Sequence, residues 1–360
     1  MSDVLLLSRY DRLGASSRIR SYQFLPALAA QGIEVTVCPL FDDAFLHARH
    51  AGRRLAWSHI ASMYLGRIKD MLARRRESVL WVEYELLPWL PFAFERVLLA
   101  GGRPVVIDYD DAIFHRYDQH GSAIVRRMLG RKIDRLMHRA TLVIAGNDYL
   151  ASRARLAGAS RVEIVPSVID LAGYRQKADD GSAELVVGWI GSPSTVHYLR
   201  SLEPALRALA GMLPMRLVNV GGAAWTPSGF PVDNLAWSEA TEVERMLQFD
   251  VGVMPLADDP WSRGKCGFKL IQYMGCALPV VASPVGANAT IVEDGVTGFH
   301  ATTSDEWTRA LATLARSIPL RRAMGRAGFA RLKKHYTLDV AAPKLARIFT
   351  DIIPGRRARS

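Results

Sequence analysis

Short runs of apolar residues alternate with longer stretches of helical periodicity along the whole chain. This alternation is typical of parallel α/β sheets, in which buried strands are linked by crossover helices. In the first half, the pattern predicts strands at residues 4–7, 33–38, 79–82, 104–107, 142–144 and 162–165. In the second half, it predicts strands at residues 185–190, 216–220, 235–237, 251–254 and 279–282. Each half therefore has enough strands to form a sheet of its own.

A polar stretch separates the two groups of predicted strands. Residues 172–184 (AGYRQKADDGSAE) contain few apolar side chains and carry charges and a glycine, as interdomain linkers do. The length of 360 residues also suits two domains of roughly 150 to 200 residues each. We therefore expect an N-terminal domain over residues 1–173, a second domain over residues 174–340 and a C-terminal helical segment over residues 341–360.

Composition and charge narrow the classes of function. No run of about 18 apolar residues occurs, and the first residues read as a strand and not as a signal peptide, so we expect a cytoplasmic protein. Cys38, Cys266 and Cys276 lack paired spacing, so neither a disulfide nor a zinc site is expected. The net charge of +11 indicates anionic partners, which are nucleic acid, phosphorylated substrates or acidic lipid.

The common nucleotide-binding and hydrolase motifs are missing from the sequence. The turn after the first predicted strand, SRYDRLGASSR, contains Gly14 alone and does not match GxGxxG. The motifs GxxxxGK[ST], GxSxG and HExxH do not occur either. The sequence therefore disfavours a dinucleotide-dependent enzyme, a P-loop hydrolase, a serine hydrolase and a metalloprotease.

Three aspartates follow the strand predicted at residues 104–107. Asp108, Asp110 and Asp111 form a D-x-D pattern, which GT-A glycosyltransferases use to hold a divalent cation. Short acidic patterns also arise by chance, and a second α/β half with a helical tail does not suit a GT-A chain. Because open α/β sheets bind ligands at the carboxyl ends of their strands, Asp110 and Asp111 are candidate catalytic residues. We expect no bound metal and no cofactor.

Residues 250–299 hold the most informative pattern, which reads strand, loop, helix, strand, loop. Gly264, Lys265 and Gly267 precede the predicted helix, where free amides and a lysine favour an anion. Lys269 and Gln272 follow at a spacing that puts them near Lys265 on one helix face. The arrangement would suit a diphosphate and a ribose. A surface helix with two solvated lysines is the alternative that the same spacing allows.

Several short motifs in the second half resemble a known family. They are MGCA at residues 274–277, PVVAS at 279–283 and DGVTGF at 294–299. GWIGSPSTVHYL at residues 188–199 and VGG at 220–222 extend the likeness. Together with the N-terminal GASSR turn and the tail RAMGRAGFARLKKHYTLD, they resemble the donor-binding signature of family 4 retaining glycosyltransferases, which have the GT-B architecture.

The resemblance implies a fold and an activity, and together with the residue patterns above it indicates a set of site residues. The fold would be two Rossmann-like, doubly wound α/β domains facing a cleft, with the C-terminal helix crossing back onto the first. The activity would be metal-independent, retaining transfer of a sugar from a nucleotide-diphosphate sugar to an acceptor, which would be a precursor of a surface polysaccharide or glycolipid. The catalytic residues would be Asp110, Asp111, Lys265 and Lys269. The donor-binding residues would be Gly191, Ser192, Gly221, Trp237, Gly264, Lys265, Lys269 and Gln272. The acceptor-binding residues would be Gly14, Ser16, Arg18 and Arg20.

The sequence also departs from that family. Members typically carry two glutamates where this chain has Gly264 and Gln272, and an Arg and a Lys that are missing from GSPSTVHYL. A non-catalytic protein that binds nucleotide sugars therefore stays an alternative. A GT-B epimerase acting on the nucleotide sugar is a second alternative, although no acidic or histidine constellation supports it.

The first half carries two basic amphipathic stretches. Residues 49–77 combine an excess of Arg and Lys with apolar residues at helical spacing, and residues 126–139 repeat the pattern on a smaller scale. One interpretation is a face that attaches the protein to the acidic inner surface of the cell membrane. The other is ordinary helices that pack on the sheet. Nucleic acid is not expected as a partner, because no aromatic stacking platform or known recognition motif accompanies the charge.

Overall fold

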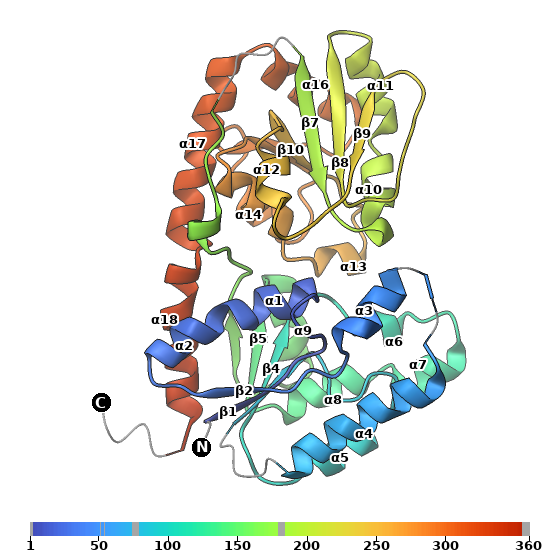
Figure 1. Ribbon diagram of the computed structural model, residues 1–360, viewed down its shortest axis with the longest axis vertical. Coiled ribbons are helices and arrows are strands. Elements are labelled where there is room, and N and C mark those ends of the chain that lie inside the picture. Colours follow the sequence, from blue (N-terminus) through green and yellow to red (C-terminus); the bar gives the residue numbers. More distant parts are fainter. Residues whose placement is uncertain (1–2, 51, 54, 74–78, 179–183, 355–360) are drawn as a thin grey trace. The chain divides into compact units, whose positions relative to one another are not determined.

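The computed structural model describes residues 3–50, 52–53, 55–73, 79–178 and 184–354. The chain divides into two compact units, Met1–Ser167 with Leu338–Ser360, and Val168–Thr337. Each unit is built around one parallel sheet of six strands (Figure 1). The sequence placed the first division after residue 173 and the second after residue 340, whereas the units divide after Ser167 and after Thr337.

The first unit has the strand order β2-β1-β3-β4-β5-β6. Four of its strands are completely buried, because uninterrupted apolar runs can be covered on both faces of a sheet. The pairing of β3 with β4 sets Glu83 opposite Asp108, so acidic residues end two neighbouring strands. The strands are β1 Val4–Leu7, β2 Val35–Val37, β3 Val79–Glu83, β4 Val105–Tyr109, β5 Leu142–Ala145 and β6 Val162–Ile164.

Helices connect the strands of the first unit. They are α1 Ala15–Arg20, η1 Tyr22–Phe24, α2 Leu25–Ala30, α3 Asp43–His50, α4 Trp57–Ala73, α5 Phe92–Leu98, α6 His115–Asp118, α7 Ala123–Leu129, α8 Lys132–Arg139 and α9 Asp148–Leu156. The last helix of the chain, α18 Leu338–Ile352, also belongs to this unit. Its Phe349 ring lies 5.0 Å from the ring of Trp81 in β3, and its Lys344 donates a 2.8 Å hydrogen bond to Ile164 O.

The second unit has the strand order β12-β11-β10-β7-β8-β9. The strands are β7 Leu185–Ile190, β8 Met215–Val220, β9 Val232–Leu235, β10 Val251–Met254, β11 Val280–Ala282 and β12 Gly298–His300. The helices are η2 Leu171–Gly173, η3 Pro193–Thr195, α10 Val196–Arg200, α11 Glu203–Ala210, α12 Glu242–Met246, α13 Pro260–Arg263, α14 Phe268–Gly275, α15 Asn288–Ile291, α16 Ser304–Ala315 and α17 Ile318–His335.

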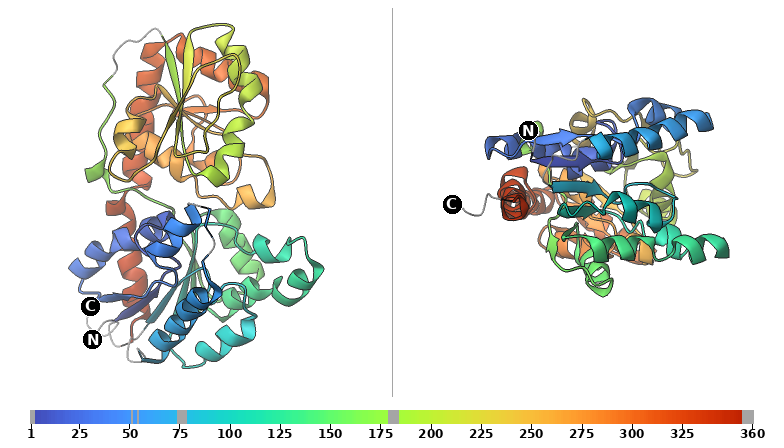
Figure 2. Two further views of the ribbon diagram at one scale, coloured as in Figure 1. Left: turned by 45° about the vertical axis from the view of Figure 1, so that its right-hand side comes forward. Right: turned by 90° about the horizontal axis from the view of Figure 1, so that it is seen from below.

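Alternate residues of the central strand β7 enter two different apolar clusters of this unit. Val187 and Trp189 pack with α11 and α16, whereas Val186 and Ile190 pack with α14 and α17. This period of two is what a strand covered on both faces requires. Helices accordingly flank the sheet on both sides (Figure 2).

The predicted α/β class with two parallel sheets is confirmed. Two details of the strand prediction were wrong. Strand β9 covers Val232–Leu235 instead of residues 235–237, and β12, Gly298–His300, was not predicted. Strand β12 has no apolar run to reveal it and depends on a close approach: a Cβ atom at Gly298 would lie 2.0 Å from Val280 O.

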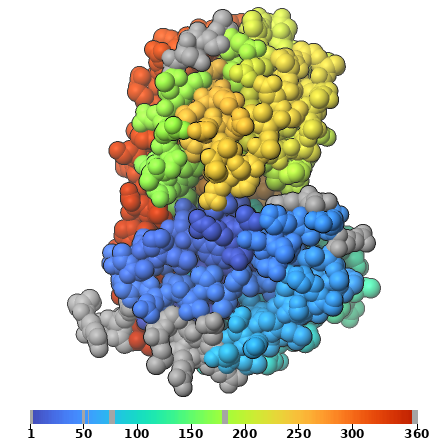
Figure 3. All heavy atoms as spheres, viewed as in Figure 1, coloured from blue at the N-terminus to red at the C-terminus, as the bar shows by residue number. Residues whose placement is uncertain are grey.

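Helix α4 buries a narrower face than its apolar pattern predicted. Arg67 and Met71 are buried, whereas Trp57 is 84% exposed and Leu65 and Leu72 are also exposed. The light-blue segment that contains α4 forms part of the surface in Figure 3. Residues 74–78 of the basic stretch lie outside the described residues. In the described parts of the chain, none of the helices combines the length and apolar character that crossing a bilayer needs.

Candidate active site

The carboxyl edge of the second sheet brings three predicted donor-binding residues together. Gly191 follows β7, Gly221 follows β8 and Trp237 follows β9. Gly221 has φ +76°, and a Cβ atom there would lie 2.5 Å from Gly191 O and 2.7 Å from Trp237 Cβ. Glycine is therefore required at this point, because the three backbones approach too closely for a side chain. Ser192 is the N-cap of η3, where its side chain meets Thr195.

Lys269 lies at the same edge of the second sheet. Its Nζ atom is 5.3 Å from the centroid of the Trp189 ring, within the range of a cation–π contact. That ring packs against Gly191, where a Cβ atom would lie 2.2 Å from Trp189 Cη2. The Trp189 ring therefore lies against both the Lys269 ammonium group and the glycine turn after β7.

Lys265 stands in the loop between α13 and α14. Its backbone N–H donates to Ser262 O, and its Nζ atom lies 5.8 Å from the ring centroid of Trp261. Gly264 is the C-cap of α13, and Gly267 is the N-cap of α14 with φ +67°. A Cβ atom at Gly267 would lie 2.2 Å from Ile291 Cδ1, so only glycine lets the loop enter the helix here.

Gln272 is more deeply buried than Lys265 and Lys269, which are half-buried. It is 4% exposed, on a helix whose neighbouring residues Leu270, Ile271 and Tyr273 are also buried. Lys265 precedes the first residue of α14, so the helical spacing that grouped it with Gln272 does not apply to it. The helical spacing thus places Lys269 and Gln272, but not Lys265, on one face of α14, and ribose binding by Gln272 stays a prediction.

Asn288 is a polar residue near this loop that the sequence did not single out. It is fully buried, and its Nδ2 donates to Ser283 O at 3.2 Å. Its Oδ1 has no hydrogen-bond partner in the described part of the chain. Because a buried acceptor without a partner is destabilising, this amide is a further candidate for ligand contact. An asparagine at the start of a short helix, as here in α15, offers no spacing signal that would have revealed it.

Acidic residues gather at the carboxyl edge of the first sheet. Asp108 and Tyr109 end β4, and Asp110 and Asp111 follow directly. Glu83 ends the neighbouring strand β3 and is 2% exposed. It accepts hydrogen bonds from Arg9 N at 2.9 Å and Ser17 Oγ at 2.5 Å. Glu83 thereby fixes the turn after β1. Glu83 could have been predicted from the sequence in the same way as the aspartates, because it too is an acid at the end of a parallel strand.

Arg20 lies inside the first unit. It is 3% exposed, and its Nη2 and Nε reach Asp108 Oδ1 at 2.8 and 3.2 Å. Its Nη1 donates to Val165 O at 2.9 Å. These bonds join α1 to the ends of β4 and β6, which gives Arg20 a structural role in place of the acceptor contact that the sequence predicted.

The other predicted acceptor-binding residues belong to the start of α1. Gly14 is its N-cap, and a Cβ atom there would lie 2.3 Å from Tyr10 Cβ, so the turn requires glycine. Ser16 and Arg18 lie in the first turn and are half-buried. The structure therefore places them within reach of solvent beside the turn that Glu83 holds.

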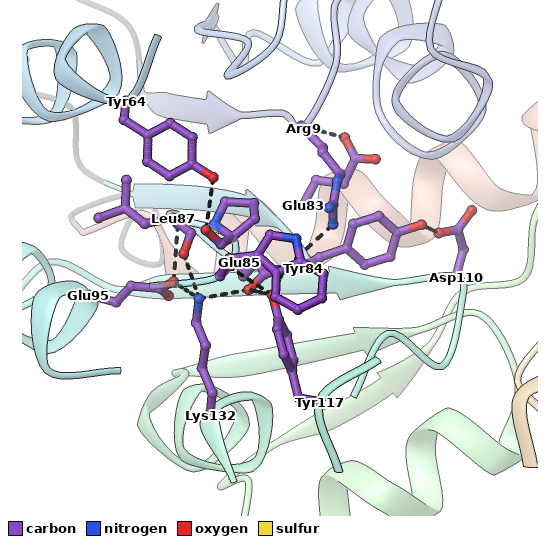
Figure 4. A network of polar contacts seen from close by, with 12 residues as sticks. Arg9, Tyr64, Glu83, Tyr84, Glu85, Leu87, Glu95, Asp110, Tyr117 and Lys132 are labelled. Atoms are coloured by element: carbon purple, nitrogen blue, oxygen red, sulfur yellow. Dashed lines mark hydrogen bonds and ion pairs between the residues drawn. The ribbon is translucent and has the colours of Figure 1, made fainter. Parts of the chain in front are cut away.

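Tyr84 and Asp110 form a hydrogen-bonded pair in which both pKa values are raised. The Tyr84 hydroxyl donates a hydrogen bond to Asp110 (Figure 4). Burial raises the pKa of Asp110 to about 7, and the negative charge of Asp111 acts in the same direction, while Arg20 and the Tyr84 hydrogen bond oppose it. A carboxyl group that titrates near neutral pH can accept or share a proton under physiological conditions, which is typical of functional sites.

A metal ion at this edge of the sheet would need a cluster of ligating side chains. Within residues 3–50, 52–53, 55–73, 79–178 and 184–354, no group of three or more His, Cys, Asp and Glu side chains is arranged to hold a metal ion. The D-x-D pattern thus does not gather a third ligand among the residues described. Metal independence stays a prediction.

Part of the second unit matches a known protein family. Residues 187–317 match the family described as Glycosyl transferases group 1. A stretch of 197 residues is 26% identical to D-inositol 3-phosphate glycosyltransferase of Segniliparus rotundus, and it covers 48% of this chain and 43% of that relative. The chain thus matches less than half the length of this curated relative.

Solved structures resemble the whole chain. HepE of Anabaena, solved with UDP and glucose, has a TM-score of 0.72 at 16% identity and covers 97% of this chain and 100% of that one. Sucrose-phosphate synthase of Thermosynechococcus elongatus has a TM-score of 0.73 at 15% identity, over 98% and 99% of the two chains. At such identities the likeness is one of fold. The comparisons confirm the predicted fold class, and the family match over residues 187–317 agrees with the predicted kinship to glycosyltransferases.

Proposed function

The chain has the GT-B fold, its residues 187–317 belong to the group 1 glycosyltransferases, and from this we propose that it transfers a sugar from a nucleotide-diphosphate sugar to a carbohydrate or lipid-linked acceptor. One observation carries the proposal. Lys269 and Gly191 share the Trp189 ring at the carboxyl edge of the second sheet, inside the segment that matches the family. Open α/β sheets bind their ligands at this edge.

In the proposed reaction, the lysines stabilise the leaving nucleoside diphosphate. Its negative charge grows as the bond to the sugar breaks, so positive groups placed beside it favour the transition state over the ground state. Lys265 and Lys269 would supply that charge in place of a metal ion. The 37% exposed ring of Trp237, next to Gly221, would stack on the base.

The first sheet would handle the acceptor. An ionised Asp110 can accept a hydrogen bond from the hydroxyl of the sugar acceptor. The hydrogen bond that Tyr84 donates to Asp110 holds this carboxylate in one orientation. Burial and the neighbouring Asp111 keep the pKa of Asp110 high, so the carboxylate can also take up the proton that the hydroxyl releases. Retention of the anomeric configuration is the outcome that the family resemblance implies for this transfer.

We further propose that the first unit attaches to the acidic inner face of the cell membrane, where a lipid-linked acceptor would be held. Trp57, Leu65 and Leu72 are exposed on α4, and Lys69 is exposed beside them. Apolar side chains with basic neighbours on a surface helix are the combination that inserts at a lipid interface. The net charge of +11 favours the same acidic surface.

A thermal-shift panel of UDP-, GDP-, ADP- and dTDP-sugars tests donor binding. The likeness to HepE, solved with UDP and glucose, makes UDP-glucose the first donor to try. One nucleotide should stabilise the protein, since a ligand at a hundred times its dissociation constant adds about 2.7 kcal/mol. The same donor should then release nucleoside diphosphate in the presence of an acceptor extract. Stabilisation by none of the four classes would refute the proposal.

A non-catalytic role is the second candidate. Gly264 and Gln272 stand where family members carry glutamates, and neither side chain is an acid. In that case one nucleotide sugar would stabilise the protein, but the purified protein would neither hydrolyse nor transfer it at any enzyme concentration. Release of nucleoside diphosphate in proportion to enzyme concentration would exclude this candidate.

A further inference from the structure

The loop after β3 has a backbone conformation that its own residues do not favour. Tyr84 has φ +62° and Trp89 has φ +64°, both in the left-handed region that favours glycine. Bulky residues stay in this region only where surrounding contacts hold them there. Figure 4 shows the polar contacts that surround the loop. The question is which of them holds Tyr84, the residue whose hydroxyl reaches Asp110.

A fully buried lysine lies beneath this loop. Lys132, the first residue of α8, is 1% exposed, and its Nζ donates to Leu87 O at 2.6 Å. The same Nζ is 2.7 Å from Glu85 Oε2 and 2.8 Å from Glu95 Oε1. Glu95 in turn accepts from Leu87 N at 3.1 Å. One ammonium group thus joins the loop to α5 and α8 where water cannot compete.

Glu85 links this buried cluster to the rest of the loop. Its two carboxylate oxygens each lie 2.9 Å from the hydroxyl of Tyr117, which accepts a 3.1 Å hydrogen bond from Trp89 N. The second left-handed residue is therefore fixed through the same carboxylate. Arg9 Nη1 lies 3.5 Å from Glu85 Oε1, and its Cζ is 5.8 Å from the centroid of the Tyr84 ring.

We propose that Glu85 and Lys132 are positioning residues of the transfer reaction, which hold the loop after β3 so that Tyr84 presents its hydroxyl to Asp110. The proposal rests on the proposed function, in which Asp110 contacts the acceptor hydroxyl. Neither Glu85 nor Lys132 touches substrate, since both are buried under the loop. Their effect on catalysis passes through the Tyr84 side chain.

The sign of the pKa change of Asp110 separates this role from simple electrostatics. The hydrogen bond from Tyr84 lowers the pKa of Asp110, so its loss raises that pKa. Loss of the Glu85 charge by itself could only lower the pKa of Asp110, because removing a negative charge never makes a carboxyl group harder to ionise. If Glu85 acts by holding Tyr84, Glu85→Leu must instead raise it.

The experiment compares three variants of the full-length protein with a matched control. Tyr84→Phe removes the hydroxyl itself, Glu85→Leu removes its support at similar volume, and the double variant combines both. Tyr109→Phe is the control. Tyr109 is the last residue of β4 and is fully buried, and its hydroxyl has no hydrogen-bond partner in the described part of the chain. Each protein is titrated by the carboxyl ¹³C NMR signal of Asp110, assigned with Asp110→Asn.

We expect Tyr84→Phe to raise the titration midpoint by about one pH unit, the size of effect typical of one hydrogen bond to a charged group. Glu85→Leu should raise the midpoint in the same direction, and the double variant should add nothing to Tyr84→Phe. Tyr109→Phe should titrate like the wild type. A lowered or unchanged midpoint in Glu85→Leu, or full additivity in the double variant, would overturn the proposal.

A second, milder variant tests the same proposal if Glu85→Leu does not fold. Tyr117→Phe removes the hydroxyl that reaches both Glu85 oxygens and accepts from Trp89 N, and it leaves the contact of Glu85 with Lys132 in place. This milder variant should raise the midpoint by a smaller amount, and no change in it would count against the proposal. The NMR titration needs no turnover, so it can succeed where the proposed function fails. If turnover is found, the acid limb of its pH profile should move with the same variants.

Discussion

Asp110→Asn is expected to stabilise the protein while it lowers transfer activity. The change keeps the shape of the side chain and an oxygen that can accept the Tyr84 hydrogen bond. It removes a negative charge that burial and the neighbouring Asp111 disfavour. The carboxylate is thus held in the folded chain against a free-energy penalty, which is common where a residue is kept for function.

The size of this penalty follows from the pKa of Asp110. Folding raises this pKa from 3.8 to about 7. At about 1.4 kcal/mol for each pKa unit, the ionised group destabilises the folded state by on the order of 4 kcal/mol above pH 7. Asp110 is half-buried, so solvent screening reduces this figure, and we expect about 2 kcal/mol. For a domain of this size the gain corresponds to roughly 4 to 8 °C in Tm.

The pH dependence fixes the sign of the prediction. A raised pKa stabilises the folded protein below pH 3.8, and this contribution is lost as pH rises through about 7. Thermal unfolding should therefore show Asp110→Asn and the wild type close together at pH 4 and well separated at pH 8. Transfer at pH 8 should fall, because an amide binds a hydroxyl more weakly than a carboxylate does.

Asp258→Asn provides a control, because the pKa of Asp258 is shifted in the opposite direction from that of Asp110. A hydrogen bond from Arg263 lowers the pKa of Asp258, so its ionised form is favoured in the folded protein. This variant should gain nothing at pH 8. If Asp110→Asn melts at or below the wild-type temperature at pH 8, the carboxyl group is not held against a penalty and the argument for its perturbed pKa is refuted.

Three further predictions concern the lysines, the metal and the membrane. Lys265→Ala and Lys269→Ala should each lower turnover by a factor of about a hundred to a thousand. Each should also weaken binding of the nucleoside diphosphate more than binding of the nucleoside. Wild-type kinetics in both variants would favour the non-catalytic role. Turnover should survive EDTA, and its loss on chelation with recovery in manganese would restore the D-x-D interpretation. Trp57→Glu with Leu65→Glu should reduce co-sedimentation with vesicles of acidic lipid, as added salt should; equal binding of variant and wild type would exclude α4 as the attachment site.

The sheets of this chain could be predicted because most of their strands are rich in apolar residues, as in β1 (VLLL) and β7 (LVVGWI). Where that signal is missing the prediction failed, as at β12, whose existence depends on the contact of Gly298 with Val280 O. The glycine turns of the second sheet were also predictable from spacing and family resemblance. Gly191 and Gly221 lie together because parallel strands end at one edge.

The buried charges could not be predicted in the same way. Arg20 pairs with Asp108, and Lys132 pairs with Glu85, in each case across a long separation in sequence. Charged residues have a strong prior for the surface, so no local pattern marks the few that are buried. Arg20 was therefore interpreted as an acceptor contact, and Lys132 as part of a basic surface stretch.

The two sheet edges differ in the charge they offer to the proposed reaction. The second sheet has Lys265 and Lys269 in the segment that we propose binds the donor, and Gly264 and Gln272 stand where the family resemblance leads us to expect glutamates. A cationic edge suits a leaving diphosphate, whose negative charge grows during transfer. The first sheet offers Asp110 instead, and a carboxylate suits a hydroxyl whose proton becomes more acidic as its oxygen bonds to the sugar. Loss of the glutamates therefore removes acids from the edge where the reaction needs cations, and it leaves the acid at the other edge intact.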